Sequence, residues 1–115
     1  MQLTDALDSH VARFGAEFFE SDEGTVLTLS GELDLAVAQP LEAIALRALE
    51  KSDHEMFYVD VSNLSFCGSQ GLSLFVRIDR VARDLGHRFV LRGPRPMLTR
   101  LLVVTALDQQ LTVEP

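Results

Sequence analysis

The stretch Asn63-Leu64-Ser65-Phe66-Cys67-Gly68-Ser69-Gln70-Gly71-Leu72 joins an apolar run ending at Asp60-Val61 to a helical pattern that extends to about Leu85. It is polar enough to be a loop, and it places Ser69 at the predicted start of the helix. A serine there can cap the helix, because its hydroxyl accepts a hydrogen bond from a backbone N–H group two or three residues later. The same hydroxyl can face solvent at a helix end whose dipole favours negative charge, where a phosphoryl group would be tolerated. Position alone leaves both a structural cap and a modification site open.

Before this stretch, the sequence predicts a hairpin and a helix. Strands are expected over residues 16–21 and 25–30, joined at the turn Asp22-Glu23-Gly24. Apolar residues then recur at helical spacing, at Val37, Leu41, Ile44, Ala45, Ala48 and Leu49. Proline is tolerated only in the first turn of a helix, so Pro40 predicts that this helix starts near Ala38.

After it, strands and helices alternate. The helix that follows Ser69 carries an apolar stripe and ends before Gly86. The other expected elements are a central strand over 56–61, a strand over 88–91, a helix from Pro96 to Thr105 and an edge strand over 111–113. The order β-β-α-β-α-β-α predicts an α/β fold, with a small mixed sheet of four to five strands and three main helices. The helices should cover mainly one face of the sheet.

Size and charge narrow the function classes. A chain of 115 residues is one domain, and 47% apolar residues are typical of a globular protein. The net charge of −7 opposes direct binding to nucleic acid or to an anionic membrane surface. No apolar run is long enough for membrane insertion, and the first residues lack the pattern of a signal peptide. The lone Cys67 forms no internal disulfide. We therefore expect a cytoplasmic protein.

No residue pattern supports catalysis. A Gly-x-Ser-x-Gly nucleophile motif is not met at Ser69, because Cys67 stands two residues before it. The three histidines lie far away in sequence, so Cys67 is better explained as a small buried residue. Asp60 ends the central strand and is expected to accept hydrogen bonds from nearby backbone N–H groups. The sequence predicts no enzyme, no cofactor and no metal site.

Several landmarks then fall in one order and spacing. They are Gly31-Glu32-Leu33-Asp34, Tyr58-Val59-Asp60-Val61-Ser62, Gly68-Ser69-Gln70-Gly71-Leu72, Gly93-Pro94 and Leu101-Leu102-Val103-Val104-Thr105-Ala106-Leu107. Together they resemble the STAS domain, the fold of anti-sigma factor antagonists and of the cytoplasmic tails of sulfate transporters. The resemblance runs roughly from Glu17 to Val113. It implies a single STAS-like domain over residues 14–115, preceded by an N-terminal arm over residues 1–13.

The resemblance also assigns roles to the central stretch. The family's loop reads Asp-Ser-Ser-Gly or Asp-Ser-Thr-Gly, and its first serine takes the phosphate, which makes Ser69 the implied phosphoacceptor. Gly68 replaces the family's aspartate, and Gln70 replaces its second hydroxyl residue. Glycine loosens the chain, so phosphorylation of Ser69 is expected to be slow. The family's later Thr-Gly-Leu is Thr105-Ala106-Leu107 here.

Two functions follow from the resemblance. The first is an anti-sigma factor antagonist that binds an anti-sigma factor, often a serine kinase, and so releases a sigma factor, with phosphate on Ser69 blocking the contact. The expected partner-binding residues are Gly68, Ser69, Gln70, Gly71, Leu72, Phe75 and Val76. The second is a soluble STAS subunit of an ABC-type transport complex that binds the transporter ATPase without phosphorylation. Gly68 and Gln70 favour this second function. For Leu72, Phe75 and Val76, burial in the core remains the alternative to a docking surface.

Overall fold

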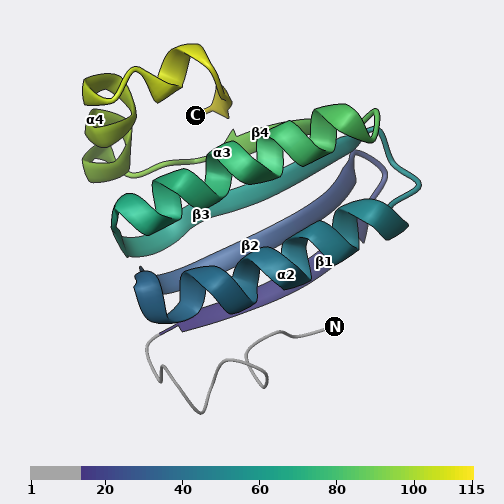
Figure 1. The fold of residues 1–115 in the computed structure, drawn as a ribbon, viewed down its shortest axis with the longest axis horizontal. Helices are drawn as coiled ribbons and strands as arrows, with labels where there is room; N and C mark the ends of the chain where they lie inside the picture. The colour runs from purple at the N-terminus through teal and green to yellow at the C-terminus, as the bar shows by residue number, and fades with distance from the viewer. Residues whose placement is uncertain (1–13) are drawn as a thin grey trace.

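The computed structural model describes residues 14–115, which build one sheet and the helices packed on it (Figure 1). The elements in chain order are β1 (Phe14–Ser21), β2 (Gly24–Leu33), α2 (Leu35–Lys51), β3 (Met56–Cys67), α3 (Ser69–Asp84), β4 (Arg88–Arg92), α4 (Pro96–Val104), the 3-10 turn η1 (Leu107–Gln109) and β5 (Thr112–Glu114). The five strands lie side by side in sequence order. β1 and β2 are antiparallel, whereas the pairs β2–β3, β3–β4 and β4–β5 are parallel. The predicted mixed α/β fold is confirmed. The proposed arm over residues 1–13 lies outside the described residues.

Helices α2 and α3 run next to each other across one face of the sheet, and α4 lies beyond the end of β4 (Figure 1). The core fills the space between those two helices and the sheet. Its largest fully buried side chains come from both layers: Phe57, Phe75, Phe89, Leu27, Leu29, Leu33, Leu41, Leu49, Leu64 and Leu74. Burial of this apolar surface is the main favourable term in folding. None of the helices in the described region is long and apolar enough to cross a membrane.

The start of α2 differs from the prediction. The helix begins at Leu35 and contains Pro40 in its second turn, although Pro40 predicted a start near Ala38. Asp34 explains the earlier start, because its Oδ1 accepts a hydrogen bond from the Ala36 N–H at 3.0 Å and so caps the helix. The carbonyl of Asp34 also accepts from Ala38 N–H at 3.0 Å. This cap, with five buried residues along the helix, outweighs the backbone hydrogen bond that Pro40 forfeits.

Strand β3 is also longer than predicted. We expected a strand over residues 56–61 and then a polar loop, but the strand continues to Cys67. Its second half pairs with the end of β2. The sequence predicted that this earlier strand ends at Ser30, but in the structure it continues to Leu33. Two register shifts interrupt this ladder, so Leu64 and Cys67 are buried three residues apart rather than two. Buried and exposed side chains therefore do not alternate regularly in this part of β3, and for that reason its sequence pattern indicated a loop.

Other predictions are confirmed. The hairpin turns at Asp22-Glu23, α3 ends before Gly86 with its φ of 82°, and β5 forms an edge strand. Asp60 Oδ1 accepts a hydrogen bond from the Ser62 N–H at 2.9 Å, as expected for a structural carboxylate.

Ala106 carries backbone strain between α4 and η1. Its φ of 61° lies in the left-handed region, which costs a residue with a Cβ roughly 1–2 kcal/mol. Glycine stands at this position in the family pattern that the chain resembles.

We expect Ala106→Gly to raise the free energy of unfolding by about 0.5–1 kcal/mol, after subtracting the entropy that glycine gains in the unfolded chain. Urea denaturation measures this, with Ala43→Gly as the control. Ala43 is exposed in the middle of α2, so the same exchange should destabilise by about 1 kcal/mol there. Destabilisation at both positions would contradict the account of Ala106.

Candidate functional site

The N-terminus of α3 places Ser69 at the surface. Gly68 is the N-cap residue, and its carbonyl accepts hydrogen bonds from the N–H groups of Gly71 at 3.0 Å and Leu72 at 3.2 Å. Ser69 is therefore the first helical residue and is exposed. The prediction that Ser69 caps the helix is wrong. Strand β3 continues to Cys67, so Gly68 is the one residue between strand and helix and occupies the N-cap position. No side chain caps α3, so the Ser69 hydroxyl is not used in that role.

The same end of the molecule carries the start of α2. The Gly68 N–H donates to the Leu33 carbonyl at 3.1 Å, which ties the start of α3 to the end of β2. Because β2 and β3 are parallel neighbours, the helices that follow them begin next to each other (Figure 1). The N-terminal halves of α2 and α3 thereby form the walls of one groove.

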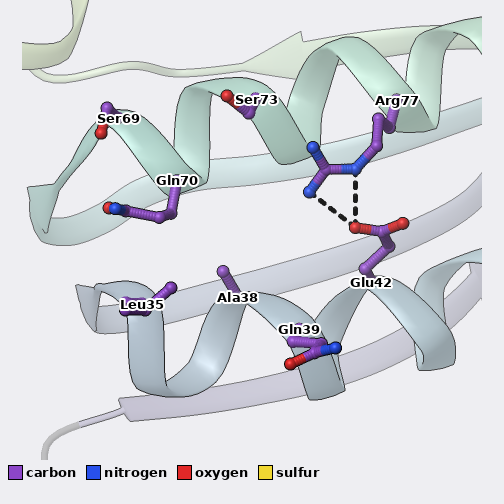
Figure 2. A pocket seen from close by; sticks show the side chains of 8 residues that line it. All are labelled: Leu35, Ala38, Gln39, Glu42, Ser69, Gln70, Ser73 and Arg77. Carbon is purple, nitrogen blue, oxygen red and sulfur yellow. Dashed lines mark hydrogen bonds and ion pairs between the residues drawn. The ribbon is translucent and has the colours of Figure 1, made fainter.

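Figure 2 shows this α2–α3 groove, which has a volume of about 410 Å³. Eight residues line it: Leu35, Ala38, Gln39, Glu42, Ser69, Gln70, Ser73 and Arg77. One ion pair crosses it between the helices. Arg77 donates through Nε at 2.7 Å and Nη2 at 2.6 Å to Oε1 of Glu42. The remaining polar lining consists of hydroxyl and amide groups, which can donate or accept hydrogen bonds.

The sequence-predicted partner residues separate into two groups. Gly68, Ser69 and Gln70 lie at or near the surface, with Ser69 and Gln70 on the groove. Gly71, Leu72 and Phe75 are buried, with Leu72 8% and Phe75 0% exposed, so the expectation that they contact a partner is wrong. Their side of α3 faces the sheet and helps to fill the core, as the alternative interpretation stated.

Val76 is half-buried and lies elsewhere. It lines a second cleft together with Asp79, Arg80 and Arg83, away from the residues of the groove. An Asp79–Arg83 ion pair forms there at 3.1 Å, at the i,i+4 spacing that is favourable on a helix. Val76 is not brought together with Ser69.

Two exposed apolar side chains at this end of the molecule were not among the site residues predicted from the sequence. Leu35 is 68% exposed at the first position of α2, and Phe66 is 47% exposed near the end of β3. The ring of Phe66 lies beside Gly68, since a Cβ on Gly68 would be 3.5 Å from it. Helical spacing groups Leu35 with buried residues of α2, so its exposure cannot be read from periodicity. For Phe66, the sequence did contain a signal of exposure, because this residue stands directly beside polar residues of the predicted loop.

The chemical groups at the site suit binding to another molecule. Burial raises the pKa of the Cys67 thiol to about 12, which leaves almost no thiolate near neutral pH. Within the described residues, no three His, Cys, Asp or Glu side chains come close enough to hold a metal ion. What the groove does offer is two accessible hydroxyls and two amides, with the exposed apolar side chain of Leu35 beside them. This combination is typical of the polar and apolar mix in protein interfaces.

Comparison with known proteins agrees with this geometry. Residues 17–114 match the family model described as "Mlab, STAS domain". Among solved structures, an anti-sigma factor antagonist from Mycobacterium paratuberculosis is 25% identical, with a TM-score of 0.73 over 89% of this chain and 86% of that one. The anti-sigma factor antagonist SpoIIAA in its unphosphorylated form is 23% identical, with a TM-score of 0.72 over 87% of this chain and 86% of that one. The phosphorylated form of SpoIIAA, a Bacillus cell fate determinant, gives 23% identity and a TM-score of 0.67, over 87% of this chain and 89% of that one. The chain therefore belongs to the STAS domain family.

Proposed function

We propose that the protein is an anti-sigma factor antagonist that docks on an anti-sigma factor through the surface around Ser69. The observation that carries the proposal is the exposed position of Ser69 at the first residue of α3, on a groove with Leu35 at its edge and Phe66 nearby. The likeness to the Mycobacterium paratuberculosis anti-sigma factor antagonist supports it. Binding to the anti-sigma factor would free the sigma factor that it holds.

Each part of this surface has a role in the proposed contact. Leu35 and Phe66 supply apolar area that a partner can bury, and such anchors dominate the energy of many interfaces. Gln39 and Gln70 offer amide groups to polar atoms of the partner. Ser69 lines the same groove as Leu35, Gln39 and Gln70, so a change of charge at its hydroxyl acts next to these groups.

Phosphorylation of Ser69 is the proposed switch, in which a partner of the serine kinase type transfers the γ-phosphoryl group of ATP to the Ser69 oxygen and releases ADP. A phosphoryl group adds nearly two negative charges to an interface that has none in the first turn of α3. The helix itself tolerates the group, because negative charge at a helix N-terminus is favourable. That SpoIIAA has been solved in unphosphorylated and phosphorylated forms, both similar to this chain, supports a modification that leaves the fold intact.

The test is a direct affinity measurement. Each anti-sigma factor and each ABC-type transporter ATPase encoded in the source genome is purified and titrated with the protein by calorimetry. Saturable binding to an anti-sigma factor, with release of its sigma factor, is the expected result. Binding to no anti-sigma factor in the set would contradict the proposal.

One observation favours the second candidate, a subunit that binds a transporter ATPase. Gly68 and Gln70 occupy the positions of the family's aspartate and second hydroxyl, and α3 has no side-chain cap. A contact that never requires phosphorylation would tolerate these changes. Tight binding to an ATPase, without phosphorylation of Ser69 under any condition, is the outcome that would select this function.

Gly68→Asp gives a further prediction for the switch. The backbone of Gly68 is ordinary for any residue, with φ −86° and ψ −177°, and an added Cβ would come no closer than 3.3 Å, to the end of the flexible Gln70 side chain. The new carboxylate can cap α3 and hold Ser69 more firmly in line with the γ-phosphoryl group. We expect transfer from the cognate kinase to quicken by up to about twofold, as an N-cap worth a few tenths of a kcal/mol allows. Initial rates of phosphate incorporation measure this. A rate that stays the same or falls would show that loop order does not limit transfer.

A further inference from the structure

Two glutamine side chains line the α2–α3 groove, one from each wall. Gln39 belongs to α2, and Gln70 projects from α3 on the side that faces α2 (Figure 2). Both residues are exposed, and neither amide is hydrogen-bonded to another residue within 14–115. A primary amide has both donor and acceptor groups. Each wall of the groove therefore offers a hydrogen-bonding group of both kinds to whatever enters it.

The lining of the groove has no unpaired charge in the part of the chain that the structure describes. Glu42 and Arg77 are its ionic side chains, and they pair with each other at 2.6 Å. A charged side chain that entered the groove would lose its hydration without gaining a counter-ion of its own, which is unfavourable. The lining therefore suits a neutral occupant that can donate and accept hydrogen bonds.

The start of α3 adds two donors at the open end of the groove. No side chain caps this helix, and the Gly68 carbonyl accepts from Gly71 and Leu72. The N–H groups of Ser69 and Gln70 therefore have no acceptor among the described residues, as is usual for the first turn of an uncapped helix. The Gln70 amide lies close by, since its Oε1 would be 3.3 Å from a Cβ on Gly68. Donors and an acceptor are thus grouped at this end.

A peptide group is a neutral partner that matches these groups. It carries one N–H donor and one C=O acceptor. In a helix both are already bonded within the element, whereas an extended segment outside a sheet leaves them available.

We propose that the α2–α3 groove holds an extended segment of the anti-sigma factor, and that Gln39 and Gln70 hydrogen-bond to its main chain. This rests on the proposed function and names what the docking surface recognises. Leu35, exposed at the edge of the groove, packs against a side chain of that segment. Main-chain hydrogen bonds supply affinity in this kind of recognition, and neighbouring side-chain contacts supply specificity.

The first test measures the affinities of Gln39→Leu and Gln70→Leu for the cognate anti-sigma factor by calorimetry. Leucine is similar in size to glutamine and equally suited to a helix, but it has no hydrogen-bonding group. Each variant leaves a peptide group of the segment buried without a partner, so each should bind about fivefold or more weakly. Gln109→Leu is the matched control, because Gln109 is exposed and lines the other cleft. Its affinity should stay within about twofold of the unsubstituted protein.

Hydrogen exchange of the anti-sigma factor identifies the occupant. In the complex, the N–H groups of one non-helical segment should exchange about tenfold or more slowly than in the free factor. The Gln39→Leu/Gln70→Leu double variant, added to saturation, should lose most of this protection, because the main chain no longer has its partners.

Unchanged or tighter binding of both leucine variants would overturn the proposal and would point to an apolar occupant, such as the face of a partner helix. Protection confined to helices of the anti-sigma factor would overturn it as well. Both results leave the proposed function in place, since the factor still binds. Binding of the unsubstituted protein to no anti-sigma factor would instead contradict the proposed function, and this recognition with it.

Discussion

Gly71→Ala is expected to destabilise the protein by about 1–3 kcal/mol, although the same exchange within a helix usually stabilises by up to about 1 kcal/mol. The reason is the packing of α3 against the sheet. A Cβ on Gly71 would lie 2.6 Å from Sγ of Cys67 and 2.9 Å from Cδ2 of Leu33. Both neighbours are buried, so neither can move aside without disturbing the core. Urea denaturation followed by circular dichroism measures the change.

Two variants separate this clash from other causes. Cys67→Ala/Gly71→Ala removes the closest atom, so the double variant should be more stable than the sum of the two single changes predicts. Gly68→Asp alters the neighbouring glycine where the nearest atom is a flexible side-chain end, and its effect on stability should stay within a few tenths of a kcal/mol. Strict additivity of the two alanine changes would contradict the assignment of Gly71 to close packing.

Leu35→Ala is expected to weaken binding to the anti-sigma factor by about 2 kcal/mol, roughly thirtyfold, if Leu35 is an anchor of the contact. Leu35 is 68% exposed in the free protein, so truncating it removes little of the core and the free energy of unfolding should barely change. Isothermal titration calorimetry with the cognate anti-sigma factor gives the affinity. Denaturation of the free variant gives the stability.

Val104→Ala is the matched control for Leu35→Ala. Val104 is an exposed aliphatic side chain, 76% accessible, at the end of α4 rather than on the α2–α3 groove. Its truncation should leave the affinity within about twofold of the unsubstituted protein, as for a residue outside the contact. Equal losses for the two variants, or no loss for Leu35→Ala, would place the docking surface elsewhere.

Much of the fold could be predicted because its signals are local. Gly86 ends α3 with a positive φ, and Pro96 begins α4, as the sequence indicated. The errors arose where a cap, buried neighbours or strand pairing overrode the simpler local rule. The Asp34 cap and buried neighbours hold Pro40 inside α2, and pairing with the end of β2 extends β3 to Cys67 through an irregular ladder.

The site was predicted only in part, for a similar reason. The position of Ser69 at the junction of strand and helix follows from sequence order. Which side chains face a partner depends on how α2 and α3 lie across the sheet. An apolar stripe on a helix does not show which of its residues the sheet covers and which remain exposed. Leu72 and Phe75 face the core, while Leu35, from a segment 34 residues before Ser69, lines the same groove. The Arg77–Glu42 pair likewise joins two helices and has no signature in either one.

The most direct test of the account compares Ser69→Asp with Ser69→Asn in binding to the cognate anti-sigma factor by calorimetry. The two side chains are nearly equal in size and differ in charge, and negative charge is itself tolerated at a helix N-terminus. If charge at this position controls docking, Ser69→Asp should bind at least about tenfold more weakly than Ser69→Asn, a difference of about 1.4 kcal/mol. Ser69→Asn should stay close to the unsubstituted protein. Equal affinities of the two folded variants would contradict the claim that Ser69 lies at the regulated docking surface.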